Sequence, residues 1–128
     1  MGYETQFRGK IFFDREIDWQ TGSEIESFRN TRHNYGSHRS PWSHIKISQD
    51  GKSMEWDGGE KTYDLEFYVT VIINKFLVPN GYTCNGQIDA QGQGMFDFWA
   101  IEVEKNKVYR ITYKFIEATR EEIYGDVS

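Results

Sequence analysis

The residue types best suited to holding an anion are concentrated between residues 29 and 46. This window contains all three histidines of the chain, and no acidic residue occurs between Ser27 and Gln49. Guanidinium groups bind phosphates, and aromatic rings stack on bases. The window therefore predicts a cationic, aromatic loop that holds a phosphate or a planar ring. Its candidate ligand-binding residues are Arg32, His33, Tyr35, His38, Arg39 and Trp42.

Two alternatives to this site stay open. The loop is equally consistent with a solvated segment whose charges balance the acidic half of the chain, or that binds across a homomeric interface. The spacing of the histidines matches no standard metal-ligand pattern, so we expect no metal and no cofactor.

A second candidate is the turn from Trp56 to Lys61, which concentrates Asp57, Glu60 and Lys61 around two glycines. Its carboxylates are candidates for acid–base work or metal binding, and its lysine could reach an anion. The structural alternative is a strand-to-helix connection, in which the glycines supply backbone freedom and the acids complement a helix dipole. The Gly-Lys-Ser/Thr pattern of a phosphate loop is absent.

A polar row forms the third candidate. Residues 82–92 alternate, so that Asn85, Gln87, Asp89 and Gln91 share the face opposite Cys84. Across a hairpin the row could meet Glu102 and Glu104. Amides suit hydrogen-bonded recognition of a base, sugar or peptide edge, whereas the alternative is a plain exposed sheet face. Cys84 is expected to be a small core residue rather than a nucleophile.

The spacing of apolar and polar residues predicts the strands and helices that position these side chains. Alternation predicts a strand over 3–13, with Phe12 covered where it breaks the polar face. A short helix is expected over 21–33, capped by Thr21 or Ser23, as a lid on the sheet. Asp50-Gly51 predicts a hairpin between strands that carry Ile45 and Trp56. In the last strand Tyr109, Ile111, Tyr113 and Phe115 are expected to face the core.

Residues 62–78 are predicted to be a helix. Leu65, Val69, Ile72 and Phe76 form a helical stripe, and seventeen residues are long for a strand. Pro79 and Gly81 then end the element in the expected order. Trp56 and Trp99 are expected to be largely buried. The fold class is α+β, a two-layer sandwich with a mostly antiparallel sheet of about six strands and two helices on one face.

Composition and charge narrow the function classes. The 128 residues fit one domain, expected over 1–117, with a polar tail over 118–128. The net charge is −5, divided as +1 over residues 1–52 and −6 over 53–128. This balance argues against general binding to nucleic-acid backbones. A single cysteine and the lack of a spanning apolar run or signal peptide favour a cytoplasmic protein without a membrane partner.

Two motifs resemble a family of small uncharacterised proteins found in bacteria and their phages. The first is W-D-G-G-E-K-T-Y-D, residues 56–64, and the second is N-G-Q-I-D-A-Q-G, residues 85–92, followed by Asp97 and Trp99. The likeness covers most of the chain. It departs at Gln93, where family members carry more acid. The resemblance implies fold boundaries and a bacterial or phage source, with the host cytoplasm as the location if phage-encoded, but no mechanism.

Three functional readings follow. The preferred one is a small non-catalytic binding domain that recognises a protein partner or a small anionic, nucleotide-like ligand, with a phage–host or anti-defence role among its uses. The second is an acid–base enzyme acting on a phosphorylated or nucleotide substrate. The third is a structural subunit of a homo-oligomer. The first is preferred because catalysis needs a convergent constellation, and the sequence shows only scattered candidates.

Overall fold

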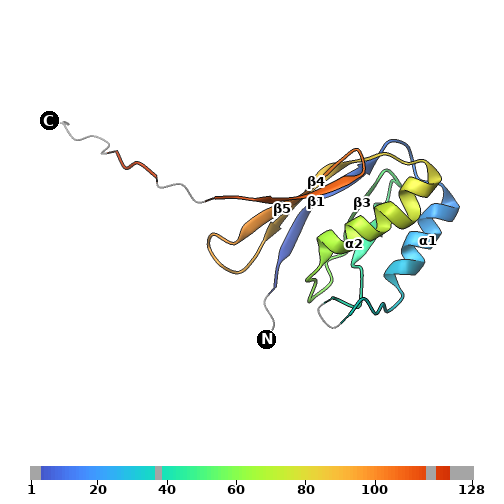
Figure 1. The fold of residues 1–128 in the computed structure, drawn as a ribbon, viewed down its shortest axis with the longest axis horizontal. Helices are drawn as coiled ribbons and strands as arrows, with labels where there is room; N and C mark the ends of the chain where they lie inside the picture. Colours follow the sequence, from blue (N-terminus) through green and yellow to red (C-terminus); the bar gives the residue numbers. More distant parts are fainter. Residues whose placement is uncertain (1–3, 37–38, 115–117, 122–128) are drawn as a thin grey trace.

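The protein folds as an α+β sandwich with one open sheet and two helices on one of its faces (Figure 1). The computed structural model describes residues 4–36, 39–114 and 118–121. Six antiparallel strands lie in the order β2-β3-β1-β4-β5-β6. They are β1 (Gln6–Phe13), β2 (Ile45–Ile47), β3 (Ser53–Trp56), β4 (Cys84–Gln91), β5 (Phe98–Glu104) and β6 (Lys107–Thr112). The predicted fold class is confirmed.

The first helix, α1 (Trp19–Arg29), begins earlier than predicted because Asp18 is its cap. The Asp18 carboxylate accepts hydrogen bonds from the Thr21 backbone N–H and hydroxyl, both at 2.8 Å, and from the Tyr82 hydroxyl at 2.6 Å. These bonds, that of Tyr82 first, lower the pKa of Asp18 to about 2. Ile25 and Phe28 are buried in the core, so α1 is more than a lid.

The second helix confirms the helical interpretation of the apolar segment and adds an irregularity. It runs as α2 (Leu65–Ile72), continues as a π-helical turn over Ile73–Leu77, and ends in a 3-10 turn over Val78–Asn80. Leu65, Val69 and Ile72 are fully buried as expected. The wider π turn rotates the end of the stripe, so Leu77 enters the core and Phe76 is only half-buried against Phe28.

Phe7 links both halves of the core. Its ring centroid lies 5.3 Å from that of Trp56 and 5.9 Å from that of Trp99, with both rings edge-on. Both tryptophans pack against the core cluster with intermediate exposure, which agrees with the expectation that they are largely, though not completely, buried. Gly9 allows β1 to lie close against β4, because a Cβ at Gly9 would collide with the carbonyl oxygen of Gln87.

The sheet has one covered and one open face, and two expectations fail there. Phe12 lies on the open face and is 53% exposed, because none of the described helices packs on that side. In β6, Val108, Arg110 and Thr112 lie opposite Val103, Ile101 and Trp99, so these residues face the helices. Tyr109, Ile111 and Tyr113 therefore point to the open face, the reverse of the prediction, while Phe115 lies outside the described residues.

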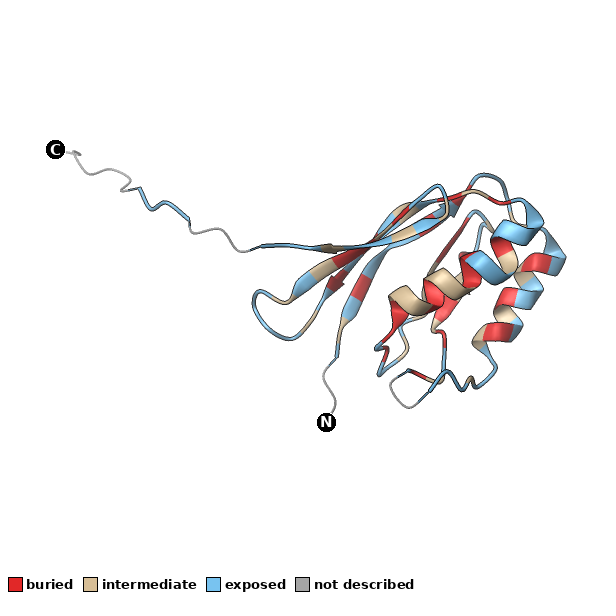
Figure 2. Ribbon diagram, viewed as in Figure 1, coloured by how far each residue is buried: buried red, intermediate tan, exposed pale blue. Residues whose placement is uncertain are grey.

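Buried residues gather where the helices face the sheet, and the end of the sheet with the β4–β5 turn extends past both helices (Figures 1 and 2). None of the described helices is both long enough and apolar enough to cross a membrane. Residues 118–121 are exposed and form neither helix nor strand. The domain bounds of 1–117 and 118–128 stay a prediction.

The π turn generates the first test. Leu77→Ala should lower the free energy of unfolding by about 2–5 kcal/mol, because it leaves a cavity in the core. Phe76→Ala should cost less, since that ring is only partly buried. Urea unfolding of the two variants and the parent measures both. A larger loss for Phe76→Ala would show that the helix continues as a regular α-helix past Ile72.

Candidate functional site

The cationic loop and the Trp56–Lys61 turn do meet, and the residue that joins them is Asp57. Its carboxylate lies 3.6 Å from Arg29 and 3.4 Å from His44 Nδ1, and it accepts the Gly59 N–H at 2.8 Å. The Asp57 N–H donates to the His44 carbonyl at 2.9 Å. Gly59 has to lack a side chain here, because a Cβ would overlap the His44 ring. Asp57 thus holds the turn to the loop through Arg29 and His44.

A second acid, Asp64 at the start of α2, holds the other end of the loop. Its carboxylate accepts the Ser40 N–H at 2.7 Å and lies 3.4 Å from the Arg39 guanidinium. The same guanidinium stacks over the Phe67 ring at 4.6 Å. Arg39 is therefore occupied by an acid and a ring of the same chain.

The aromatic residues of the loop pack inward on the helices. His33 stacks on Phe28 with centroids 4.0 Å apart, and its Nε2 lies 2.8 Å from the Phe28 carbonyl oxygen. Tyr35 packs edge-on against Phe67 and Tyr68, at 5.1 and 5.9 Å. These contacts stabilise the loop and leave less ring surface for a ligand.

The remaining predicted residues of this site do not converge in the described structure. Arg32, Glu60 and Lys61 are exposed and form no ion pair with a described residue. Trp42 is partly exposed, and His38 lies outside the described residues. The cavity beside Glu60 and Lys61 holds only about 30 Å³, the space of about one water molecule. The local geometry favours the structural alternative, an internally neutralised loop, although the ligand-binding hypothesis stays a prediction.

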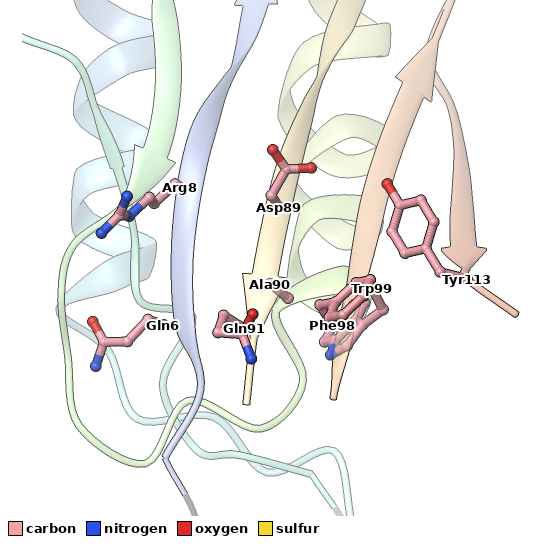
Figure 3. A pocket seen from close by; sticks show the side chains of 8 residues that line it. All are labelled: Gln6, Arg8, Asp89, Ala90, Gln91, Phe98, Trp99 and Tyr113. Atoms are coloured by element: carbon pink, nitrogen blue, oxygen red, sulfur yellow. The ribbon is translucent and has the colours of Figure 1, made fainter. Parts of the chain in front are cut away.

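A larger cavity, about 590 Å³, lies on the open face of the sheet (Figure 3). This volume falls in the range of ligand pockets. The predicted polar row supplies two of its walls, Asp89 and Gln91. Its whole lining consists of Gln6, Arg8, Asp89, Ala90, Gln91, Phe98, Trp99 and Tyr113. We call this cavity the open-face pocket.

The strand register explains which side chains meet there. Gln6 lies opposite Gln91, and Gln91 lies opposite Phe98. Phe98 in turn contacts Tyr113, with ring centroids 5.5 Å apart. Two amides and two rings therefore form one row across β1, β4, β5 and the residue after β6. Directly opposite residues of an antiparallel pair share a face, so the row is a consequence of pairing.

The next row places Arg8 opposite Asp89. Their charged groups do not form an ion pair, and Arg8 has no ion-pair partner within the described part of the chain. One Asp89 oxygen accepts the Gln87 side-chain amide at 2.8 Å. The Gln91 amide nitrogen faces carbonyls of the β4–β5 turn at 3.1–3.4 Å, which leaves its oxygen to accept. The pocket thus offers a guanidinium, two acceptors and two exposed rings.

The covered face holds these strands in place from behind. The Arg110 guanidinium lies 3.9 Å above the Trp99 ring and 3.7 Å from the Glu66 carboxylate. Burial raises the pKa of Glu66. Because Arg110 and Glu66 lie on the helix side, they fix β5 and β6 against α2 without filling the open-face pocket.

Sequence reasoning missed Gln6, Arg8, Phe98 and Tyr113. Gln6 and Arg8 were on the correct polar face of β1, but nothing in the sequence shows that β1 neighbours β4. For Tyr113 the sequence predicts a core position, because its strand is apolar on that side. The two-residue turn at Lys105-Asn106 is the sequence feature from which the pairing of Phe98 with Tyr113 could have been predicted. The turn sets Glu104 opposite Lys107, and the same register then aligns Phe98 with Tyr113.

The described residues offer neither an accessible cysteine nucleophile nor a cluster of metal-binding side chains. Cys84 is fully buried, and burial raises the pKa of its thiol to about 12. No group of three or more His, Cys, Asp and Glu side chains arranged to hold a metal occurs in residues 4–36, 39–114 and 118–121.

Searches of protein-family models, curated proteins and solved structures found no match to this chain. The resemblance to bacterial and phage proteins therefore stays a prediction.

The Asp57 junction gives a test of the structural alternative. Asp57→Ala should lower the free energy of unfolding by about 1–3 kcal/mol, because it removes the Gly59 hydrogen bond and the acid beside His44, and leaves Arg29 with Glu26 as its one described acid. Glu60→Ala, three residues on and exposed, is the matched control and should stay within about 0.5 kcal/mol. Denaturant unfolding at neutral pH measures both. Equal, negligible effects would show that Asp57 is free for another role.

Proposed function

We propose that the protein is a small non-catalytic binding domain whose open-face pocket recognises a small anionic ligand with a planar ring, of the nucleotide type. The observation that supports this most is the open-face pocket itself. It combines an exposed aromatic pair, hydrogen-bond acceptors and a guanidinium that no described acid engages, within one cavity of about 590 Å³.

The aromatic pair accounts for ring binding. Phe98 is 42% exposed and Tyr113 is 48% exposed, although each could have packed in the core had the register differed. A flat ring stacked on such side chains gains about 1–3 kcal/mol. Stacking tolerates many ring types, so selectivity has to come from the polar groups beside the rings.

The polar groups set charge and orientation. Arg8 can make charge-assisted hydrogen bonds to a phosphate or carboxylate, because it is not engaged by a described acid. Asp89 and the Gln91 oxygen accept hydrogen bonds, so they favour a ring that presents N–H groups on its edge. A guanine nucleotide has a flat ring, a phosphate and N–H groups on the ring edge, and it is therefore the first probe. The net charge of −5 is consistent with a short ligand rather than a long polyanion.

Calorimetric titration with guanosine monophosphate, guanosine and inorganic phosphate tests the proposal. The nucleotide should bind most tightly, because only it engages both the rings and Arg8. Phe98→Ala should weaken nucleotide and nucleoside binding by about 1–3 kcal/mol. Arg8→Gln should weaken nucleotide binding about tenfold, a loss of about 1.4 kcal/mol, and leave guanosine binding unchanged.

Two controls separate the alternatives. Lys10→Gln removes the next cation on the same strand and face, outside the pocket lining, and should have little effect. The Arg32→Ala/Arg39→Ala double variant addresses the loop site. Binding lost in the loop variant but kept in Arg8→Gln would move the site to the loop, and no binding of any probe would refute a nucleotide-type ligand. Product formed during incubation would favour the enzyme alternative.

A further inference from the structure

The two edges of the sheet are protected to very different degrees. At one edge β2 is three residues long, and the Glu26 carboxylate of α1 accepts the Ile47 N–H at 2.9 Å. At the other edge β6 is six residues long, and no described side chain bonds to its backbone. Exposed edges of this length pair readily with another strand. Among the described residues, the sheet therefore has one capped edge and one open edge.

The hairpin geometry shows which backbone groups are open. Lys105 and Asn106 both have positive φ, 47° and 71°, which is typical of a two-residue type I′ turn. In such a hairpin the closing pair, Glu104 and Lys107, exchanges both hydrogen bonds, and bonded pairs then alternate. The N–H and C=O groups of Val108, Arg110 and Thr112 consequently point away from β5.

The side chains along this edge are apolar on the open face. Tyr109 and Tyr113 are 46% and 48% exposed, and Ile111 lies between them, half-buried. No charged side chain interrupts the stripe from Tyr109 to Tyr113 on that face. An apolar stripe beside unbonded backbone groups favours pairing with another strand over exposure to solvent.

We propose that this partner is a second copy of the chain, with β6 pairing antiparallel to β6 of the partner about a two-fold axis at Ile111. A two-fold axis perpendicular to the sheet requires antiparallel pairing. Because the β2 edge is capped, the assembly closes at two copies instead of growing into a fibre. The proposal rests on the edge alone and is independent of the ligand.

Side-chain pairing selects Ile111 as the centre. With this register Arg110 lies opposite the partner's Thr112, and these residues have the outward backbone groups needed to bond. Tyr109 lies opposite the partner's Tyr113, an aromatic cross-strand pair. A register centred on Arg110 would set the two guanidinium groups against each other. One centred on Tyr109 would leave Tyr113 unpaired.

The proposed pairing also extends the open-face pocket. Tyr113 lines that pocket, so the partner's Tyr109 would lie next to it and add a third ring to the aromatic wall. Each protomer would receive one ring from the other, and the two pockets would lie on the same face of a continuous sheet.

Sedimentation velocity of the full chain over a range of concentrations tests the pairing. The parent should sediment as a dimer, and both Ile111→Lys and Ile111→Glu should sediment as monomers, because like charges would meet on the axis. An equimolar mixture of the two variants should regain the dimer, since opposite charges then face each other. Phe12→Lys is the matched control. It replaces an exposed apolar residue on the same face, away from the edge, and should leave the dimer intact.

Circular dichroism and thermal unfolding establish that each variant is folded. Recovery of the dimer in the mixture supports the register, because only pairing at residue 111 brings the two new charges together. A parent that is monomeric at every concentration, folded single variants that dimerise like the parent, or a mixture that stays monomeric would each overturn the proposal.

Discussion

The two-residue turn at Lys105 and Asn106 is the constraint on which the open face depends. The Asn106 side chain accepts the Cys84 N–H at 2.6 Å and donates to the Tyr82 carbonyl at 3.0 Å, while the Lys105 N–H donates to the Asn85 side chain at 2.9 Å. The turn is thereby fixed to the start of β4, and the register of β6 is fixed with it. A shift of one residue would send Tyr109, Ile111 and Tyr113 to the helix side. Both the aromatic wall of the pocket and the apolar edge would then be lost.

The interior of the fold follows from patterns that the sequence carries locally. Alternation located β1 and β4, the stripe from Leu65 to Ile72 located α2, and Asp50-Gly51 located the β2–β3 hairpin. Errors arose where a distant contact decides the outcome. The π turn displaced Phe76 because the core accommodates Leu77. Asp18 replaced the predicted cap because Tyr82, sixty-four residues on, shares its carboxylate. The sequence predicts Tyr109 and Tyr113 on the inward face because an apolar stripe on a strand usually marks its buried side.

The two candidate regions differ in how their charges are used. In the cationic loop Arg29 and Arg39 lie against Asp57 and Asp64, so these two guanidinium groups stabilise the connection to α2, whereas Arg32 is exposed. On the open face Arg8 has no described partner, although Asp89 lies directly across the strand pair. A cation that no described acid engages and that lies beside exposed rings is better placed to bind a ligand than one held by a neighbouring acid.

We propose that recognition takes place on the open face. Amide chemical-shift mapping of the full chain during titration with guanosine monophosphate tests it most directly, because it reports the location without any substitution. We expect the shifts to concentrate at Arg8, Asp89, Gln91, Phe98 and Tyr113, while residues 29–46 and 57–61 remain near their free positions. Shifts confined to the loop and the Trp56–Lys61 turn, or the absence of any saturable shift, would contradict it.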